Sequence, residues 1–388
     1  MTARQVVVLV GVIAVATWGV SSARSLSRTA NPDFDRHESE RAGPDSARLA
    51  GLLDALGKTD RVVCEMVADQ VGDFWMDDGG SGVGRFADGA TAGRSAKDSL
   101  AGRVTEPRAI TLLVSRLNTD DACARRLAAK MLGRSSIRTD RLLQLFDDGV
   151  PRISEAAAYA IGTGERKEAR GALEKSLSGR GNAVAAMAAW ALGEIRDSGS
   201  VPLLVKALRS DDGRVRHASM YALGEIRAEG ALSEIERLLH TDPDVPVRVA
   251  AARAIGEIGA ESSLHALAGA LEDGAMPVRY AAAAAFAELH DVHKAPEALV
   301  RAATGSDVKL RRIAAHALAE IADPSSVNVF IALLTSDDRE LRLAAVHALG
   351  QIAAPKAVPD LVRMLKDPDA EVRRAAAEVL GDMKLDDR

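Results

Sequence analysis

One stretch of about 31 residues recurs nine times along this chain. It is most legible at 212–226, where it reads D-G-R-V-R-H-A-S-M-Y-A-L-G-E-I. Taking Gly224 as the reference position of that copy, the same position returns every 29 to 32 residues. Such a period is typical of arrays in which each unit packs only on its neighbours. The reference positions are Gly133, Gly162, Gly193, Gly224, Gly256, Ala287, Ala319, Gly350 and Gly381.

Every unit contains two helical segments. In the regular units the first begins at an aspartate, passes through Val-Arg and ends near the reference position; the second follows a short link and carries a V-P-x-L pattern, as at 201–204. Hydrophobic residues make up 47% of the chain but aromatic residues only 3%. This balance indicates a core of Ala, Leu, Val and Ile between closely packed helices. The sequence therefore predicts an all-α solenoid of about nine two-helix repeats over 106–388.

Two columns of charged residues run through the array. Twelve residues before the reference position six of nine residues are aspartate, and eight before it seven of nine are arginine. An aspartate there would cap the first helix, and an arginine one turn later would pair with it or with the aspartate of the next unit. The predicted structural ladder consists of Asp121, Arg125, Asp212, Arg216, Asp244, Arg248, Arg279, Asp307, Arg311, Asp338, Arg342, Asp369 and Arg373.

Small residues fill the remaining columns of the first helix. Ala218 and Ala222 are typical of them, and we expect such residues to let neighbouring helices approach closely. The reference glycine is expected to relieve crowding where the chain turns into the link.

The unit D-x-x-V-R-x-x-A-A-x-A-L-G-x-I, followed by V-P-x-L, resembles the HEAT-like repeats typified by the phycobilin lyases (the PBS lyase HEAT-like type) over 106–384. The resemblance implies a right-handed superhelix whose second helices line a concave surface. It also implies relatives that act as chromophore lyases, scaffolds or hydroxylases. A hydroxylase of this type would carry His-Glu pairs that bind iron, whereas the one His-Glu here is His37-Glu38, outside the array. No catalytic residue, metal site or cofactor is therefore expected.

The N-terminus carries an export pattern. Arg4 precedes an apolar run at 6–20, and small residues follow at 21–23. The run has the length of a signal-peptide core and is short for a membrane-spanning helix. We interpret 1–23 as a signal peptide, with an uncleaved inner-membrane anchor through 5–22 as the alternative. Both predict an exported protein, periplasmic or secreted.

Composition divides the region before the array into three segments. Residues 24–44 are polar and predict a flexible spacer, 45–75 predict a degenerate helical pair that caps the array, and 76–105 predict a Gly-rich loop. In an oxidising compartment Cys64 and Cys123 would be able to form a disulfide; the alternative is two buried free thiols.

Three aromatic residues occupy a single column. Tyr159, Trp190 and Tyr221 each stand three residues before the reference position, in consecutive units. Amphipathic aromatic side chains are favoured binding anchors, so one interpretation is a partner-binding strip. The other is packing across unit boundaries.

The predicted function follows from shape and charge. A net charge of −5 gives no pull toward nucleic acid, and an extended curved surface suits a protein or peptide ligand. We predict a non-catalytic protein-protein interaction scaffold or adaptor in the cell envelope. It would contact the membrane only through the N-terminal anchor, if that is retained. The oligomeric state is left open. The alternative is an accessory of an enzyme or cofactor-attachment system of the lyase type, and a metal-dependent hydroxylase is least favoured.

Overall fold

The computed structural model describes residues 46–56, 104–179, 181–289 and 292–383. All regular secondary structure in these residues is helical. The chain divides into two compact units, 1–173 and 174–388. The predicted signal or anchor (1–23), spacer (24–44) and Gly-rich loop lie outside the described residues, apart from the last residues of that loop.

The first unit contains five α-helices in the described residues, followed by a short 3₁₀ helix. Their bounds are α3 Ser46–Leu56, α6 Pro107–Arg116, α7 Ala122–Gly133, α8 Thr139–Phe146, α9 Pro151–Thr163 and η1 Lys167–Ala169; α10 Arg170–Ser176 crosses the boundary between the units.

Helix α3 covers the start of the array. It packs on α6 and α7 through the buried side chains of Leu49 and Leu53. Its first backbone N–H donates to a carboxylate oxygen of Glu106 at 2.8 Å, and Arg116 of α6 pairs with Asp54 at 2.7 Å. This helix is the first of the pair expected at 45–75, and the second lies outside the described residues. The array therefore begins under a cap that shields apolar side chains from water.

The second unit alternates long first helices with shorter second helices. The first helices are α11 Asn182–Ile195, α13 Gly213–Glu225, α15 Val245–Ile258, α17 Met276–Ala285, α19 Val308–Ile321, α21 Arg339–Gln351 and α23 Ala370–Asp382. The second helices are α12 Val201–Ala207, α14 Leu232–Thr241, α16 Leu264–Ala270, α18 Glu297–Thr304, α20 Val327–Leu333 and α22 Val358–Met364. Short 3₁₀ helices η2 Ser198–Ser200, η3 Glu229–Ala231, η4 Glu261–Ser263, η6 Pro324–Ser326 and η7 Pro355–Ala357 precede second helices, and η5 Phe286–Glu288 follows α17.

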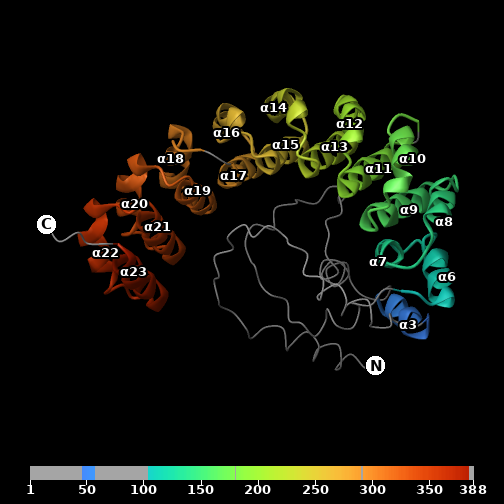
Figure 1. Cartoon of the computed structure of the whole chain (residues 1–388), viewed down its shortest axis with the longest axis horizontal. Helices are drawn as coiled ribbons and strands as arrows, with labels where there is room; N and C mark the ends of the chain where they lie inside the picture. Colours follow the sequence, from blue (N-terminus) through green and yellow to red (C-terminus); the bar gives the residue numbers. More distant parts are fainter. Residues whose placement is uncertain (1–45, 57–103, 180, 290–291, 384–388) are drawn as a thin grey trace. The chain divides into compact units, whose positions relative to one another are not determined.

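The two kinds of helix form two layers within this unit. Each first helix from α11 to α21 packs against the next first helix, and each first helix from α13 to α23 packs against the second helix that precedes it in the chain. Figure 1 shows the first helices α11, α13, α15 and α17 on the inner side of the curve that this unit follows, with α12, α14 and α16 outside them. The expectation that second helices line the concave side is therefore wrong for this unit.

The reference glycines lie where first helices touch. A Cβ atom on Gly193 would be 2.7 Å from the Cα atom of Ala222 on the next first helix, and a Cβ atom on Gly224 would be 3.1 Å from that of Ala254. Both glycines lie inside helices, so the prediction that they relieve crowding at the turn is wrong. Their missing side chain instead lets two backbones approach closely.

The chain turns into the link three residues after the reference position. The residues there adopt left-handed backbone conformations, with φ of 55° at Arg196 and 76° at Gly259. The same conformation is found at Glu165, Arg227, Ala322 and Ala353. Most of these residues have a side chain, so glycine is not what defines this turn in the sequence.

Replacing Gly193 with alanine is expected to lower the free energy of unfolding by about 1–3 kcal/mol, since the added methyl forces α11 and α13 apart. The matched control is Gly381→Ala in α23, where an added Cβ meets no atom within 4 Å. There alanine should stabilise by up to about 1 kcal/mol through its helix propensity. Urea unfolding followed by circular dichroism measures both, and equal effects at the two sites would contradict the close-approach explanation.

Candidate functional site

Arginines of the ladder bind carboxylates of the following repeat. Arg216 donates from Nε and Nη2 to the two carboxylate oxygens of Asp242, at 2.7 and 2.9 Å. Arg248 binds Asp273 in the same bidentate way at 2.9 and 3.0 Å. A third pair of this kind joins Arg342 to Asp367 at 2.8 and 3.0 Å. These planar pairs fix the register between neighbouring repeats.

The carboxylates in these pairs are not those that the sequence pattern indicated. They stand fourteen residues before the reference position, whereas the predicted aspartates stand twelve before it. Asp242 also accepts the backbone N–H of Asp244 at 2.9 Å, and Asp244 in turn accepts a bond from Arg216 at 2.8 Å. Asp242, Asp273 and Asp367 thus each tie the preceding repeat to the start of their own first helix.

The arginines also hold the loop that precedes their own helix. Arg216 Nη1 donates to the carbonyl oxygen of Ser210 at 2.9 Å, six residues earlier. The same bond to the residue six positions earlier is made by Arg125, Arg248, Arg311, Arg342 and Arg373. The arginine column therefore supports the turn into every first helix in which one of these residues stands.

Aspartates at minus twelve cap the first helices. Asp212 accepts the backbone N–H of Arg214 at 2.8 Å, and the Arg214 side chain holds the pKa of Asp212 down at about 2. Asp121, Asp307, Asp338 and Asp369 likewise accept backbone N–H groups of the first turn. Asp244 differs, because its side chain makes no cap bond and binds Arg216 instead.

The aromatic column is mostly buried. Tyr159 is 1% exposed and Trp190 9% exposed, while Tyr221 is half-buried with its hydroxyl donating to Glu194. Tyr159 belongs to the first unit and the other two to the second. Burial favours the packing interpretation of this column over an exposed partner-binding strip.

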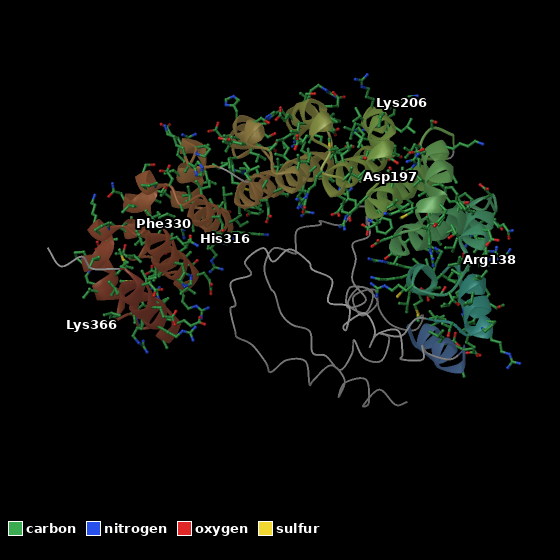
Figure 2. The ribbon with its side chains drawn as sticks, in the orientation of Figure 1. Arg138, Asp197, Lys206, His316, Phe330 and Lys366 are labelled. Carbon is green, nitrogen blue, oxygen red and sulfur yellow. The ribbon has the colours of Figure 1, made fainter. Side chains whose placement is uncertain are left out.

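Later members of the same column are exposed. Arg253, His316, His347 and Glu378 stand three residues before their reference positions, and all four are exposed. Figure 2 shows His316 on the layer of first helices and Lys206 on the layer of second helices. The column therefore changes along the second unit from buried aromatic to exposed polar side chains.

A row of glutamates runs beside this column. Glu194, Glu225, Glu257, Glu288 and Glu320 each follow the reference position directly, in five consecutive repeats. They stand at the carboxyl ends of first helices, where the helix dipole is already negative. The sequence did not predict this row, because within one repeat the glutamate is only one letter of the A-L-G-E-I signature.

The last three glutamates of the row differ from the first two in their partners. Glu257, Glu288 and Glu320 are exposed, and they form no ion pair with another residue in the part of the chain that the structure describes. The pKa of Glu257 is raised, first by partial desolvation and then by repulsion from Glu225 and Glu288, while the charges of Arg227 and Arg196 lower it to a smaller extent. Neighbouring carboxylates of the row are therefore close enough to interact.

Comparison with known families identifies the repeat. A family model of HEAT repeats matches residues 139–223, 172–248, 235–308 and 296–381, which together span more than half of the chain. The chain belongs to the HEAT-repeat family. A search of curated protein sequences found no match.

Several solved structures are similar to parts of this chain. Escherichia coli YibA is 19% identical, with a TM-score of 0.50, and the match covers 66% of this chain and 95% of YibA. An engineered protein is 23% identical with a TM-score of 0.48 over 87% of this chain and 98% of its own. The complex of CpcE and CpcF of phycocyanin lyase from Nostoc sp. PCC7120 is 22% identical with a TM-score of 0.35, covering 71% and 93%. Such identities show the fold alone.

One of the two cysteines of the predicted disulfide lies within the described residues. Cys123 is half-buried in α7 and is disulfide-bonded, while Cys64 lies outside the described residues, so their pairing remains a prediction. Among described residues, no group of three or more His, Cys, Asp and Glu side chains could hold a metal ion. None of the described helices is both long and apolar enough to cross a membrane.

His217 makes the stability of the HEAT repeats depend on pH. Its imidazole is half-buried in α13, and its Nδ1 has no hydrogen-bond partner among the described residues. Burial, and then repulsion from Arg253, lower the pKa of His217 from 6.5 to about 4. The unfolded chain therefore takes up this proton at a higher pH than the folded chain. This contribution to stability is complete above pH 6.5 and is lost as the pH falls toward 4.

Lowering the pH from 7 to about 4.5 should therefore reduce the free energy of unfolding of the wild-type protein by about 2 kcal/mol more than that of His217→Gln. Urea unfolding at both pH values measures the difference. The glutamine variant removes the titrating group but keeps a polar side chain, so other groups that titrate in this range cancel. Identical losses in the two proteins would contradict the assignment.

Proposed function

We propose that this chain is a scaffold of the cell envelope that holds a protein partner bearing basic side chains, bound on the first-helix layer of the second unit. The observation that carries the proposal is the glutamate row beside a column of exposed, variable polar residues. Membership of the HEAT-repeat family supports a role in protein interaction, because stacked repeats present an extended surface.

Folding does not account for the last three glutamates of the row. Glu257, Glu288 and Glu320 are exposed, and carboxylates at the carboxyl ends of helices are unfavourable. Repulsion between neighbours of the row, which raises the pKa of Glu257, adds to this cost. Lysine or arginine side chains of a partner would relieve both effects, which is the electrostatic complementarity that directs association.

The exposed column next to the row carries different residue types in different repeats. The column holds arginine at 253, histidine at 316 and 347, and glutamate at 378, although the buried alanines and leucines of these repeats are nearly the same. Exposed side chains of this kind can determine binding specificity because they do not pack in the core.

The test removes the charges of the row without changing the fold. Glu257, Glu288 and Glu320 are replaced together by glutamine in the full chain, and partners are crosslinked in the source cells and identified by mass spectrometry. The control replaces Glu229, Glu261 and Glu297 by glutamine, because these exposed glutamates lie on or before second helices and remove the same charge.

We expect a defined protein captured by the wild type and by the control, and at least a tenfold lower yield with the row variant, a loss of about 1.4 kcal/mol or more in binding. Equal capture by the two variants would contradict the proposed face. A visible absorption band on the purified wild-type protein would instead indicate the alternative function, an accessory that carries or attaches a chromophore.

The envelope location rests on the N-terminal sequence. Residues 6–20 form an apolar run after Arg4, followed by small residues at 21–23. Fractionation of cells that express the full chain, with protease treatment of spheroplasts, should find the repeats accessible from outside the inner membrane. Mapping the mature N-terminus by mass spectrometry separates cleavage from anchoring, and recovery in the cytoplasm would overturn the location.

A further inference from the structure

The arginine column has a member without its carboxylate. Arg279 stands eight residues before its reference position, as Arg216, Arg248 and Arg342 do. The position that supplies their aspartate in the next repeat is Gly305 in the case of Arg279. Nε of Arg279 is buried and has no hydrogen-bond partner among the described residues, whereas Nε of the other three arginines donates to an aspartate.

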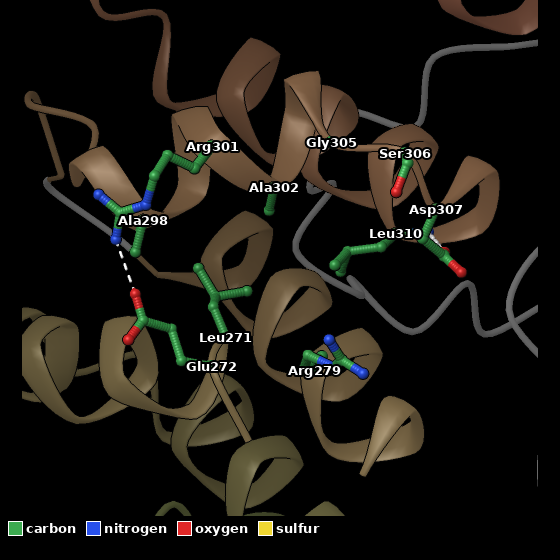
Figure 3. Close-up of a pocket in the computed structure, with 10 residues that line it drawn as sticks. All are labelled: Leu271, Glu272, Arg279, Ala298, Arg301, Ala302, Gly305, Ser306, Asp307 and Leu310. Atoms are coloured by element: carbon green, nitrogen blue, oxygen red, sulfur yellow. Dashed lines mark hydrogen bonds and ion pairs between the residues drawn. The ribbon is translucent and has the colours of Figure 1, made fainter. Parts of the chain in front are cut away.

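A pocket of about 240 Å³ lies at this place. Arg279, Gly305, Ser306 and Asp307 are among the residues that line it, with Leu271 and Leu310 as apolar walls. Figure 3 shows the Arg301–Glu272 ion pair at one end of the pocket, while Arg279, Ser306 and Asp307 lie toward the other. The volume is many times that needed for one water molecule.

We infer that this pocket binds the carboxylate group of a ligand, which takes the place that an aspartate of the next repeat takes at Arg216, Arg248 and Arg342. The guanidinium is planar and presents parallel N–H donors that match a carboxylate. A buried donor that lacks an acceptor is unfavourable, so a carboxylate that reaches Nε gains the bond that the fold leaves unmade.

Acidic residues around the pocket do not oppose this assignment. Asp307 is the counterpart of Asp244, and Arg216 binds Asp244 and Asp242 together at 2.8 Å and 2.7–2.9 Å. One arginine of this column therefore accommodates two carboxylates. Glu272 is already paired with Arg301 at 2.7 Å.

The comparison with Arg311 shows what the glycine adds. The residue opposite Arg311 is Ser336, and Nε of Arg311 is also buried without a partner. Ser336 keeps a side chain there, which accepts the backbone N–H of Asp338 at 3.2 Å. Gly305 has no side chain, so the space in front of Arg279 is open to a group from outside the chain.

The carboxylate has two possible sources, a small organic acid or an Asp or Glu side chain of a protein. The inference does not depend on the partner proposed above, because the glutamate row would bind basic groups and this pocket binds an acidic one. The probes are sodium acetate and a short peptide with one aspartate and blocked ends, each compared with sodium chloride at equal ionic strength.

The experiment follows the Nε–H resonance of Arg279 in ¹H–¹⁵N spectra of the full chain, together with thermal unfolding. We expect acetate to shift this resonance saturably and to raise the unfolding temperature. Arg279→Gln should abolish the acetate-dependent rise in unfolding temperature. Peptide binding at least tenfold tighter than acetate points to a protein side chain, and binding no tighter points to a small acid; either supports a carboxylate site.

A second variant restores the internal ligand. Gly305→Asp gives Arg279 the carboxylate that its siblings have, and the backbone at Gly305 has an ordinary φ of −71°. An added Cβ would lie 3.3 Å from the carbonyl oxygen of Arg301, so a small adjustment accommodates it. This variant should unfold at a higher temperature than wild type and no longer respond to acetate, while Gly305→Ser, which reproduces Ser336 opposite Arg311, should weaken the acetate response.

Two results would overturn the inference. One is an acetate response that is the same in wild type and Arg279→Gln. The other is an Nε–H resonance of Arg279 that neither acetate nor the peptide shifts in the wild type, since this would mean that water alone fills the pocket.

Discussion

Replacing Asp242 with alanine is expected to lower the free energy of unfolding by about 3–5 kcal/mol, because it leaves the guanidinium of Arg216 buried without its main partner. The Asp242 side chain is 1% exposed and the Arg216 side chain 10% exposed, so water does not replace the lost bonds. The backbone N–H of Asp244 loses its acceptor as well. Urea unfolding measures the loss, and hydrogen exchange in α13 and α15 locates it.

The control for this prediction is Asp211→Ala, because Arg216 binds only the backbone carbonyl of Asp211, at 3.2 Å, which the substitution keeps. Asp211 is exposed, and its removal should change stability by less than about 0.5 kcal/mol. The double variant Arg216→Met/Asp242→Leu should lose less than Asp242→Ala, since it removes both buried charges. A double variant that is less stable than Asp242→Ala would show that the pair itself, and not the stranded charge, dominates.

Replacing Trp190 with alanine is expected to cost about 3–5 kcal/mol, since a large side chain that is buried in the first-helix layer leaves a cavity. The matched control is Arg253→Ala, at the equivalent position two repeats later, where the side chain is exposed. We expect that change to stay within about 0.5 kcal/mol. Urea unfolding of the two variants side by side makes the comparison.

The same pair of variants separates packing from recognition in the aromatic column. If Trp190→Ala kept its stability but no longer captured the partner, the column would be a binding strip and the packing interpretation would fail. If stability falls as expected, any loss of capture follows from the fold, and the glutamate row remains the better candidate for the binding face.

Some features could be read from the sequence because they depend on local spacing. The period of about 31 residues required stacked helical pairs. The placement of aspartate before each first helix followed from capping chemistry, since a cap acts on N–H groups two or three residues away. Helix α3 at Ser46–Leu56 could be expected for a similar reason, because its leucines recur with helical spacing.

Other features could not be read in this way, because they depend on which repeat faces which. Spacing along one helix does not predict that Arg216 makes two hydrogen bonds to Asp242 and one to Asp244. Both aspartates lie in the next loop, and only the distance between stacked repeats decides which of them Arg216 binds. The five glutamates of the row are visible in the sequence. The repulsion between their carboxylates arises only because neighbouring first helices place these side chains side by side.

The sequence by itself determined the repeat, the all-helical architecture and the positions of the caps, because these arise from contacts within a helix or a single turn. Only the tertiary structure decided three other things: that Gly193 serves a close helix contact, that first helices form the inner layer of the second unit, and that Nε of Arg279 lacks a hydrogen-bond acceptor. Each of these depends on the distance between successive repeats, which is set by packing between residues far apart in the chain.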